Sequence, residues 1–389
     1  MSLKLVTLKP SKPFFFGKDS VYSNTNYVES EYFPQQTQIL GALRAYLLES
    51  NQLLKVHQHG KYCAKEVSDK AKKLTGTSNS SSFETNNDLG IINSISPMFI
   101  VKTAEQKICD ALFKLPANVT KFEVKKDADP CKNDQETSIK IESLKIATPK
   151  IIDGALSNNK AVILENYDVK EGFKSALGGK QFWENYSRSI QDDTITEYDK
   201  IFKSYEQVGI GLENKKTING KFYAKRSYML NKGFELAFLI DIDDKKLDEM
   251  KDYHFESGFI TMGGDTSTFK MTIYNDMPEA FQEHKVIKAL ISKEAQEGKT
   301  FVLLSDAILE KSIDKEALFQ IIPSKLRHRM YKKQNEKKDD SLLRTIRNHK
   351  TETKLLVPSG AVYFYETKKQ LPQAIGAYEK MGYNKYLAI

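Results

Sequence analysis

The chain has 389 residues, enough for two or three domains of ordinary size. Its 40% hydrophobic and 28% charged residues are typical of a globular protein and exclude a disordered or fibrous one. A net charge of +8 and a pI near 8.9 favour an anionic partner without identifying it.

The cysteines and the apolar segments exclude further classes of protein. Cys63, Cys109 and Cys131 are widely spaced and have no CxxC or CxxH neighbour, so we expect neither a disulfide framework nor a zinc site. Pro10 and Pro13 stand where a signal peptide needs its apolar segment, and every apolar run is far shorter than a membrane helix. A cytoplasmic protein without membrane contact, metal or cofactor is the expectation.

The first part of the chain alternates strand and helix patterns. SLKLVTL has period-two alternation and predicts a strand that ends at Pro10. Residues 34–48, PQQTQILGALRAYLL, place apolar residues at helical spacing and predict a long helix. The polar residues 75–88 predict a mobile loop, and SISPMFIV predicts the next strand. This order indicates an α+β fold.

Aromatic residues at helical spacing around Trp183 predict a helical connecting region over residues 166–207. After it we expect a hairpin, a strand at FELAFLIDI, and further strands at FVLLSD and LLVPSGAVYFYE. We therefore predict an N-terminal module over residues 1–165 and a C-terminal module over residues 208–389.

Residues 208–226, VGIGLENKKTINGKFYAKR, contain the most informative pattern. Asn219 and Gly220 favour a type I′ turn, which predicts a β-hairpin. Strand alternation then places Lys221, Tyr223 and Lys225 on one face, where ammonium groups suit phosphates and a ring suits an unpaired base. An ordinary solvated strand explains the same residues.

Small and basic residues give further candidates. Gly209 and Gly211, and likewise Gly263 and Gly264, permit a close approach of another backbone, although the second pair is also typical of a plain turn. Residues 325–354 have eleven Lys or Arg against four Asp or Glu, a net charge of +7. This basic arm is either a solvated surface or a phosphate-contacting segment.

The sequence contains no recognisable catalytic centre. GxSxG and HExxH patterns are absent, and His57 and His59 in HQH have no acidic or cysteine neighbour at ligand spacing. Surface histidines explain them best, and a metal-independent endoribonuclease is the alternative. We expect that the protein is not an enzyme.

Several blocks together resemble a known family. PFFFGKDSVY, PQQTQILGALRAYLL, SPMFIV, VGIGLENKKTINGKFYAKRSYML, MGGD and VPSGAVYFYE occur in the order found in the third subunit of the Cmr complex, a type III-B CRISPR effector of the RAMP superfamily. The resemblance spans nearly the whole chain. Two departures are GGDTS in place of GGE and GYN at 382–384 in place of a GxG loop, where Asn384 could still adopt a left-handed conformation.

The resemblance implies two ferredoxin-like (RRM-like) modules with irregular insertions. It implies an antiviral ribonucleoprotein in which this chain is noncatalytic and holds the 5′ handle of the CRISPR RNA. The implied partners are the large polymerase/cyclase subunit, the RAMP backbone subunits and a target RNA held by the assembly. A repeat-cleaving RAMP endoribonuclease and a protein-only scaffold are the alternatives.

The implied RNA contacts combine the glycines with nearby cations. Arg44 is expected to reach a phosphate from the helix that carries Gly41, because a guanidinium can bind phosphate bidentately. The expected RNA-binding residues are Gly41, Arg44, Gly209, Gly211, Lys221, Tyr223, Lys225, Arg226, Gly263, Gly264, Arg327, Arg329 and Lys332.

Overall fold

A computed structural model gives the fold of the chain. It describes residues 2–17, 27–56, 62–64, 69–77, 88–105, 107–125, 140–152, 161–165, 176–186, 194–213, 216–250, 252–292, 296–308, 317–323, 326–333, 348–370 and 376–389. Most of the predicted mobile loop, residues 78–87, and the HQH segment lie outside the described residues.

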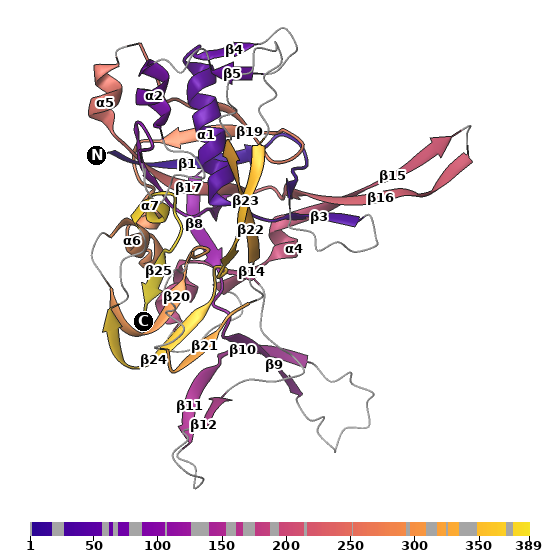
Figure 1. The fold of residues 1–389 in the computed structure, drawn as a ribbon. Coiled ribbons are helices and arrows are strands. Elements are labelled where there is room, and N and C mark those ends of the chain that lie inside the picture. Colours follow the sequence, from indigo (N-terminus) through magenta and orange to yellow (C-terminus); the bar gives the residue numbers. More distant parts are fainter. Residues whose placement is uncertain are drawn as a thin grey trace.

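A nine-stranded sheet forms the centre of the molecule (Figure 1). Its strand order is β14-β13-β8-β7-β17-β1-β19-β18, and β6 also pairs with β17. The bounds are β1 Ser2–Pro10, β6 Ile92–Ile95, β7 Phe99–Ala104, β8 Lys107–Lys114, β13 Ala176–Gly178, β14 Ile195–Glu197, β17 Phe234–Ile242, β18 Gly258–Met262 and β19 Ser267–Tyr274. The α+β prediction is confirmed.

The central sheet is covered on both faces. Along β1, Val6 and Leu8 face a core that includes helix α1 (Gln36–Ser50). Leu5 points to the opposite core, which contains α3 (Lys180–Asn185) and α6 (Lys285–Ile291). A second sheet, β21-β24-β20-β25, contributes to the same core. The bounds of its strands are β20 Glu297–Leu303, β21 Phe319–Ile321, β24 Val362–Gln370 and β25 Tyr386–Ala388.

The predicted helix and strands lie close to their expected positions, but the strands pair across the predicted modules. β1 from the N-terminal segment lies between β17 and β19 from the C-terminal segment. The predicted helical connection is only partly helical in its described residues, because β13 and β14 extend the central sheet beside α3 and α4 (Tyr198–Ile201). The division into modules stays a prediction.

The predicted hairpin is present and longer than expected. β15 (Phe202–Glu213) and β16 (Lys216–Leu230) pair, and β3 (Tyr27–Glu31) and β2 (Phe16–Gly17) extend them into a four-stranded sheet. The strands project from the body of the molecule (Figure 1). The predicted turn position was wrong: Asn219 and Gly220 lie within β16, where the register shifts opposite Ile210–Leu212. The pair thus accommodates an irregularity in the ladder instead of reversing the chain.

Shorter elements complete the fold. Three more two-stranded sheets are formed by β4–β5, β9–β10 and β11–β12, and the predicted basic arm contains a fourth, β22–β23. Their bounds are β4 Leu54–Val56, β5 Tyr62–Ala64, β9 Val119–Lys125, β10 Lys140–Ile146, β11 Thr148–Ile152, β12 Ala161–Glu165, β22 Leu326–Lys333 and β23 Asn348–Leu356. The remaining helices are α2 Asp69–Thr75, α5 Asp244–Glu249, η2 Glu279–Phe281 and α7 Gly376–Lys380.

The GYN segment packs against the chain that follows β20. Asn384 has a φ of +59°, so the left-handed conformation expected for it is present. Its side-chain oxygen accepts a hydrogen bond from Ile308 N at 2.7 Å, and its own amide donates to Asp306 O at 3.0 Å. Gly382 has a φ of +86° and lies against the backbone of Ser96. The segment therefore joins the C-terminal part of the chain to the central sheet.

His284 is a buried titratable group at the start of α6. Its Nε2 lies 2.9 Å from Ala111 O, and its Nδ1 accepts a hydrogen bond from Val286 N at 3.3 Å. These partners fit the neutral ring with its proton on Nε2. Burial lowers the pKa of His284, opposed by the hydrogen bond to Ala111 and the charge of Asp110.

This burial predicts an acid-dependent loss of stability. Since the folded-state pKa lies below that of the unfolded chain, the unfolded state binds the proton first as the pH falls through about 6.5. We expect the free energy of unfolding to decrease from pH about 7.5 to about 5, and His284→Gln to remove part of that decrease. Denaturant titrations at both pH values measure it, and an unchanged pH dependence in the variant would contradict the assignment.

Candidate nucleic-acid interface

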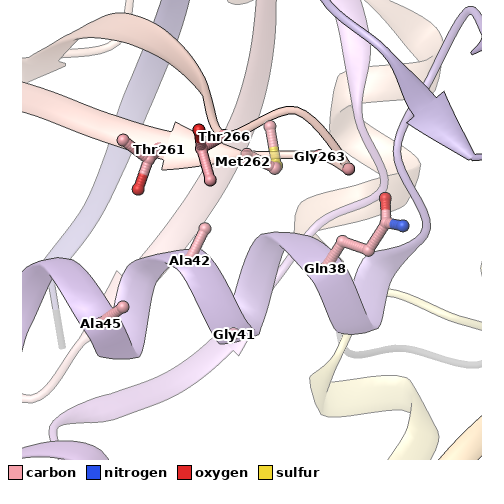
Figure 2. Close-up of a pocket in the computed structure, with 9 residues that line it drawn as sticks. Gln38, Gly41, Ala42, Ala45, Thr261, Met262, Gly263 and Thr266 are labelled. Carbon is pink, nitrogen blue, oxygen red and sulfur yellow. The ribbon is translucent and has the colours of Figure 1, made fainter. Parts of the chain in front are cut away.

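Helix α1 and the turn between β18 and β19 enclose a groove of about 440 Å³ (Figure 2). Its size lies in the usual range for ligand sites. The groove brings together three residues predicted from the sequence, namely Gly41 from the helix and Gly263 and Gly264 from the turn. The complete lining is Gln38, Gly41, Ala42, Ala45, Thr261, Met262, Gly263, Gly264 and Thr266.

The turn needs its first glycine for two reasons. Gly263 has a φ of +90°, and a Cβ atom there would collide with Phe15 O. The amide of Gly264 donates to the same carbonyl at 3.1 Å. This amide already has a partner, so the structure favours the plain-turn interpretation of the glycine pair over a pair of amides open to an oxyanion. The aromatic segment around Phe15 thereby fixes one wall of the groove.

Gly41 differs from Gly263 because nothing near it requires a glycine. A Cβ atom added there would have no neighbour within 4 Å, and its φ is not positive. A glycine inside a helix costs about 1 kcal/mol relative to alanine. The missing side chain leaves the groove open.

Arg44 lies on the same helix and is half-buried. Its Nη2 donates to Asp88 O at 3.4 Å. Burial lowers the pKa of the guanidinium to about 10, opposed by the charge of Asp88, so Arg44 remains protonated at neutral pH. The predicted contact with a phosphate stays a prediction, and the described contact holds α1 to the segment before β6.

Gly209 has a neighbour within its own hairpin. It pairs with Tyr223 across β15 and β16, and a Cβ atom on Gly209 would collide with the Tyr223 ring. The sequence interpretation assigned this space to an RNA backbone, whereas the structure fills it with the tyrosine. Tyr223 is still 55% exposed, so stacking on its open face remains possible.

The two described cations of the hairpin already have acidic partners. Lys225 forms an ion pair with Asp265 of the β18–β19 turn, and its Nζ lies 4.6 Å from the centre of the Phe15 ring. Arg226 contacts Glu206 at 2.5 Å and Glu29 at 3.2 Å. The Glu206 hydrogen bond raises the pKa of Arg226, opposed by desolvation. An RNA phosphate at either position has to compete with a carboxylate.

The other predicted residues are described by their backbone only. Gly211 lies in β15 and Lys221 in β16, at the register irregularity of the hairpin. Arg327, Arg329 and Lys332 lie in β22, which pairs with β23. The part of the basic arm between these two strands lies outside the described residues.

Sequence reasoning missed several residues of this region. Gln38, Thr261, Met262 and Thr266 line the groove, and Phe15 and Asp265 hold its edge. The signal for Gln38 was its position three residues before Gly41, which places both on one side of a helix. The contacts of Phe15 and Asp265 join distant segments and leave no local pattern.

Two negative findings apply to the described ranges alone. No group of three or more His, Cys, Asp or Glu residues among them could hold a metal ion. No helix within them has the length and apolar character required to cross a membrane.

Comparisons place these features among known proteins. A family model described as CRISPR-associated protein (Cas_Cmr3) matches residues 6–389. A search of curated proteins gave no match. A chain in the cryo-EM structure of the Type III-B Cmr-beta bound to cognate target RNA and AMPPnP, state 1, is 14% identical with a TM-score of 0.51, over 99% of this chain and 96% of that chain. This similarity shows a shared fold.

Two further solved structures are similar over most of their length. A chain of the Type III-B Cmr-beta bound to cognate target RNA is 13% identical with a TM-score of 0.49, over 99% of this chain and 96% of that chain. A chain in the crystal structure of the Csm1-Csm4 cassette in complex with pppApA is 10% identical with a TM-score of 0.34, over 97% of this chain and 98% of that chain.

Proposed function

The chain belongs to the CRISPR-associated Cas_Cmr3 family, a subunit of type III-B CRISPR effectors, and from this premise we propose that it is a noncatalytic subunit that binds the 5′ handle of the CRISPR RNA. In this role it also anchors the large polymerase/cyclase subunit and the first backbone subunit, within an assembly that holds target RNA.

The groove between α1 and the β18–β19 turn is the observation that carries the proposal. Three glycines predicted to allow close approach of RNA lie far apart in the sequence, yet all three line it. Lys225 lies beside this turn through its ion pair with Asp265. A small-walled groove with a cation at its edge suits a single strand, because bases need space and phosphates need positive charge.

The β22–β23 hairpin supplies a second contact region in the proposal. Arg327, Arg329 and Lys332 lie within eight residues of β22, and the surrounding residues 325–354 carry most of the excess positive charge of the chain. Counterion release from the RNA makes such contacts favourable and salt-dependent. RNA contacts of Arg44, Tyr223 and Arg226 belong to the same proposal.

Two ferredoxin-like modules are the architecture proposed with this function. The order β17-β1-β19-β18 supports one of them, because each neighbouring pair is antiparallel and α1 contacts β18. The sheet formed by β20, β21, β24 and β25, with α7 preceding β25, supports the other.

A salt titration of RNA binding tests the proposed function. The chain is assembled with its partner subunits, and binding of a handle-bearing guide RNA is measured over a range of salt concentrations. Replacement of Arg327, Arg329 and Lys332 together with alanine should reduce the slope of log K against log salt by roughly two units, about 0.7 for each lost phosphate contact on a single strand. The bound RNA should be recovered uncut.

A control with the same charge change separates local contacts from net charge. Lys70 and Lys73 on α2 and Lys245 on α5 are exposed and lie on other elements. Their joint replacement with alanine should leave the slope nearly unchanged. Equal slopes for wild type and the β22 variant would contradict the assignment of the arm, and an assembly that holds no guide RNA would contradict the proposed function.

A further inference from the structure

The groove between α1 and the β18–β19 turn is lined without a charged side chain. All nine described lining residues are glycine, alanine, threonine, methionine or glutamine. A phosphate held there would have no positive group on the walls to balance its charge, whereas an uncharged ring would bury its faces against Ala42 and Met262. The chemistry of the walls therefore favours a base over a phosphate.

Gln38 provides a polar group that lacks a partner. Its side chain extends from α1 toward the turn that carries Gly263 (Figure 2). Its Oε1 is buried and has no hydrogen-bond partner among the described residues. A buried amide oxygen without a donor costs about 1–3 kcal/mol. The exocyclic amino group of a base is a donor of suitable chemistry, and the Nε2 of the same amide can donate to a neighbouring ring nitrogen.

Gly41 gives an independent reason to expect an occupant. Neither a close neighbour nor a positive φ accounts for this glycine, so its destabilisation of the helix has no structural explanation among the described contacts. Any larger side chain at this position would extend into the groove that Gly41 lines. The glycine thus preserves the volume next to Gln38.

We propose that this groove receives one unstacked nucleobase of the CRISPR RNA handle and that Gln38 is the residue that recognises its edge, an inference that rests on the proposed function. The phosphates on either side lie outside the groove. On the turn side they meet Lys225, which exchanges Asp265 for a phosphate oxygen. The groove therefore determines which base fits, and the cations at its edge supply affinity that is independent of sequence.

Single abasic substitutions through the handle test the proposal. Guide RNAs with one base removed at each handle position are bound to the assembled complex. In the wild type, one position should show a loss of affinity of about 5- to 100-fold, the effect of losing one stacked and hydrogen-bonded base. In Gln38→Leu, that position should lose most of its abasic penalty, and the salt slope should stay unchanged because no phosphate contact is lost.

A second variant and a matched control complete the test. Gly41→Leu fills the groove and should remove the same abasic penalty, with a melting temperature at or above that of the wild type because leucine is a better helix former than glycine. Gln320→Leu makes the same chemical change as Gln38→Leu on exposed β21 and should leave the abasic profile unchanged.

The outcomes separate the two hypotheses. Wild-type abasic profiles in both groove variants, with RNA still bound, would overturn the base groove and leave the proposed function standing. A changed salt slope in Gln38→Leu would indicate a phosphate contact and would also overturn it. Absence of guide RNA from the wild-type assembly would overturn both.

Discussion

Replacement of Trp183 with alanine should lower the free energy of unfolding by about 3–5 kcal/mol, the usual cost of truncating a large buried aromatic residue. Trp183 is fully buried on α3. It lies beside Phe182 and Tyr186, with ring centres 5.3 and 5.8 Å away. Its Nε1 donates to Gly178 O at 3.1 Å, which ties α3 to the preceding strand. The substitution removes both the packing and this hydrogen bond.

Chemical denaturation followed by circular dichroism measures the effect, since Trp183 is the only tryptophan and its fluorescence disappears with it. Gln181→Ala on the same helix is the control, because Gln181 is exposed and its replacement should change stability by no more than about 0.5 kcal/mol. A loss below about 1 kcal/mol in Trp183→Ala would show that α3 contributes little to the core.

Gly382→Ala should destabilise the protein by roughly 2–6 kcal/mol, whereas Gly41→Ala should stabilise it by about 0.5–1 kcal/mol. At Gly382 the φ is +86°, and an added Cβ would lie 2.7 Å from Ser96 C and 2.9 Å from Ile95 O. These are backbone atoms, which cannot rotate away. At Gly41 the added methyl group enters open space and removes the helix penalty of glycine.

The opposite signs make the two glycines a matched pair. Melting temperatures of the three proteins, measured under one condition, check the prediction. A Gly41→Ala protein that melts below the wild type would show that the helix has a contact beyond the described residues, and a Gly382→Ala protein that melts with the wild type would show that the GYN segment can move away from the central sheet.

Local pattern was sufficient to predict the elements. Alternation in SLKLVTL and the helical spacing around Leu43 reflect burial on one face or both, which a short window of sequence records. The position of the turn in the long hairpin was missed, because the Asn219–Gly220 signal suits a strand irregularity as well as a reversal.

The pairing of strands could not be predicted in this way. β1 lies between β17 and β19, and nothing in the first ten residues specifies partners so distant in the chain. The same limit applies to the candidate interface. Gly41, Gly263 and Gly264 were each expected to be near RNA, and the fold brings them together. The acidic partners of Lys225 and Arg226 were missed because Asp265 and Glu29 come from other segments.

The central position of β1 has a consequence for the birth of the protein. About 220 residues separate the end of β1 from the start of β17, so at about 5–20 residues per second the first strand leaves the ribosome about 10–45 s before its neighbour exists. During that interval both edges of an apolar strand are open to wrong partners. We expect nascent chains halted before residue 234 to associate with a chaperone through their first ten residues, and released full-length chains to fold slowly.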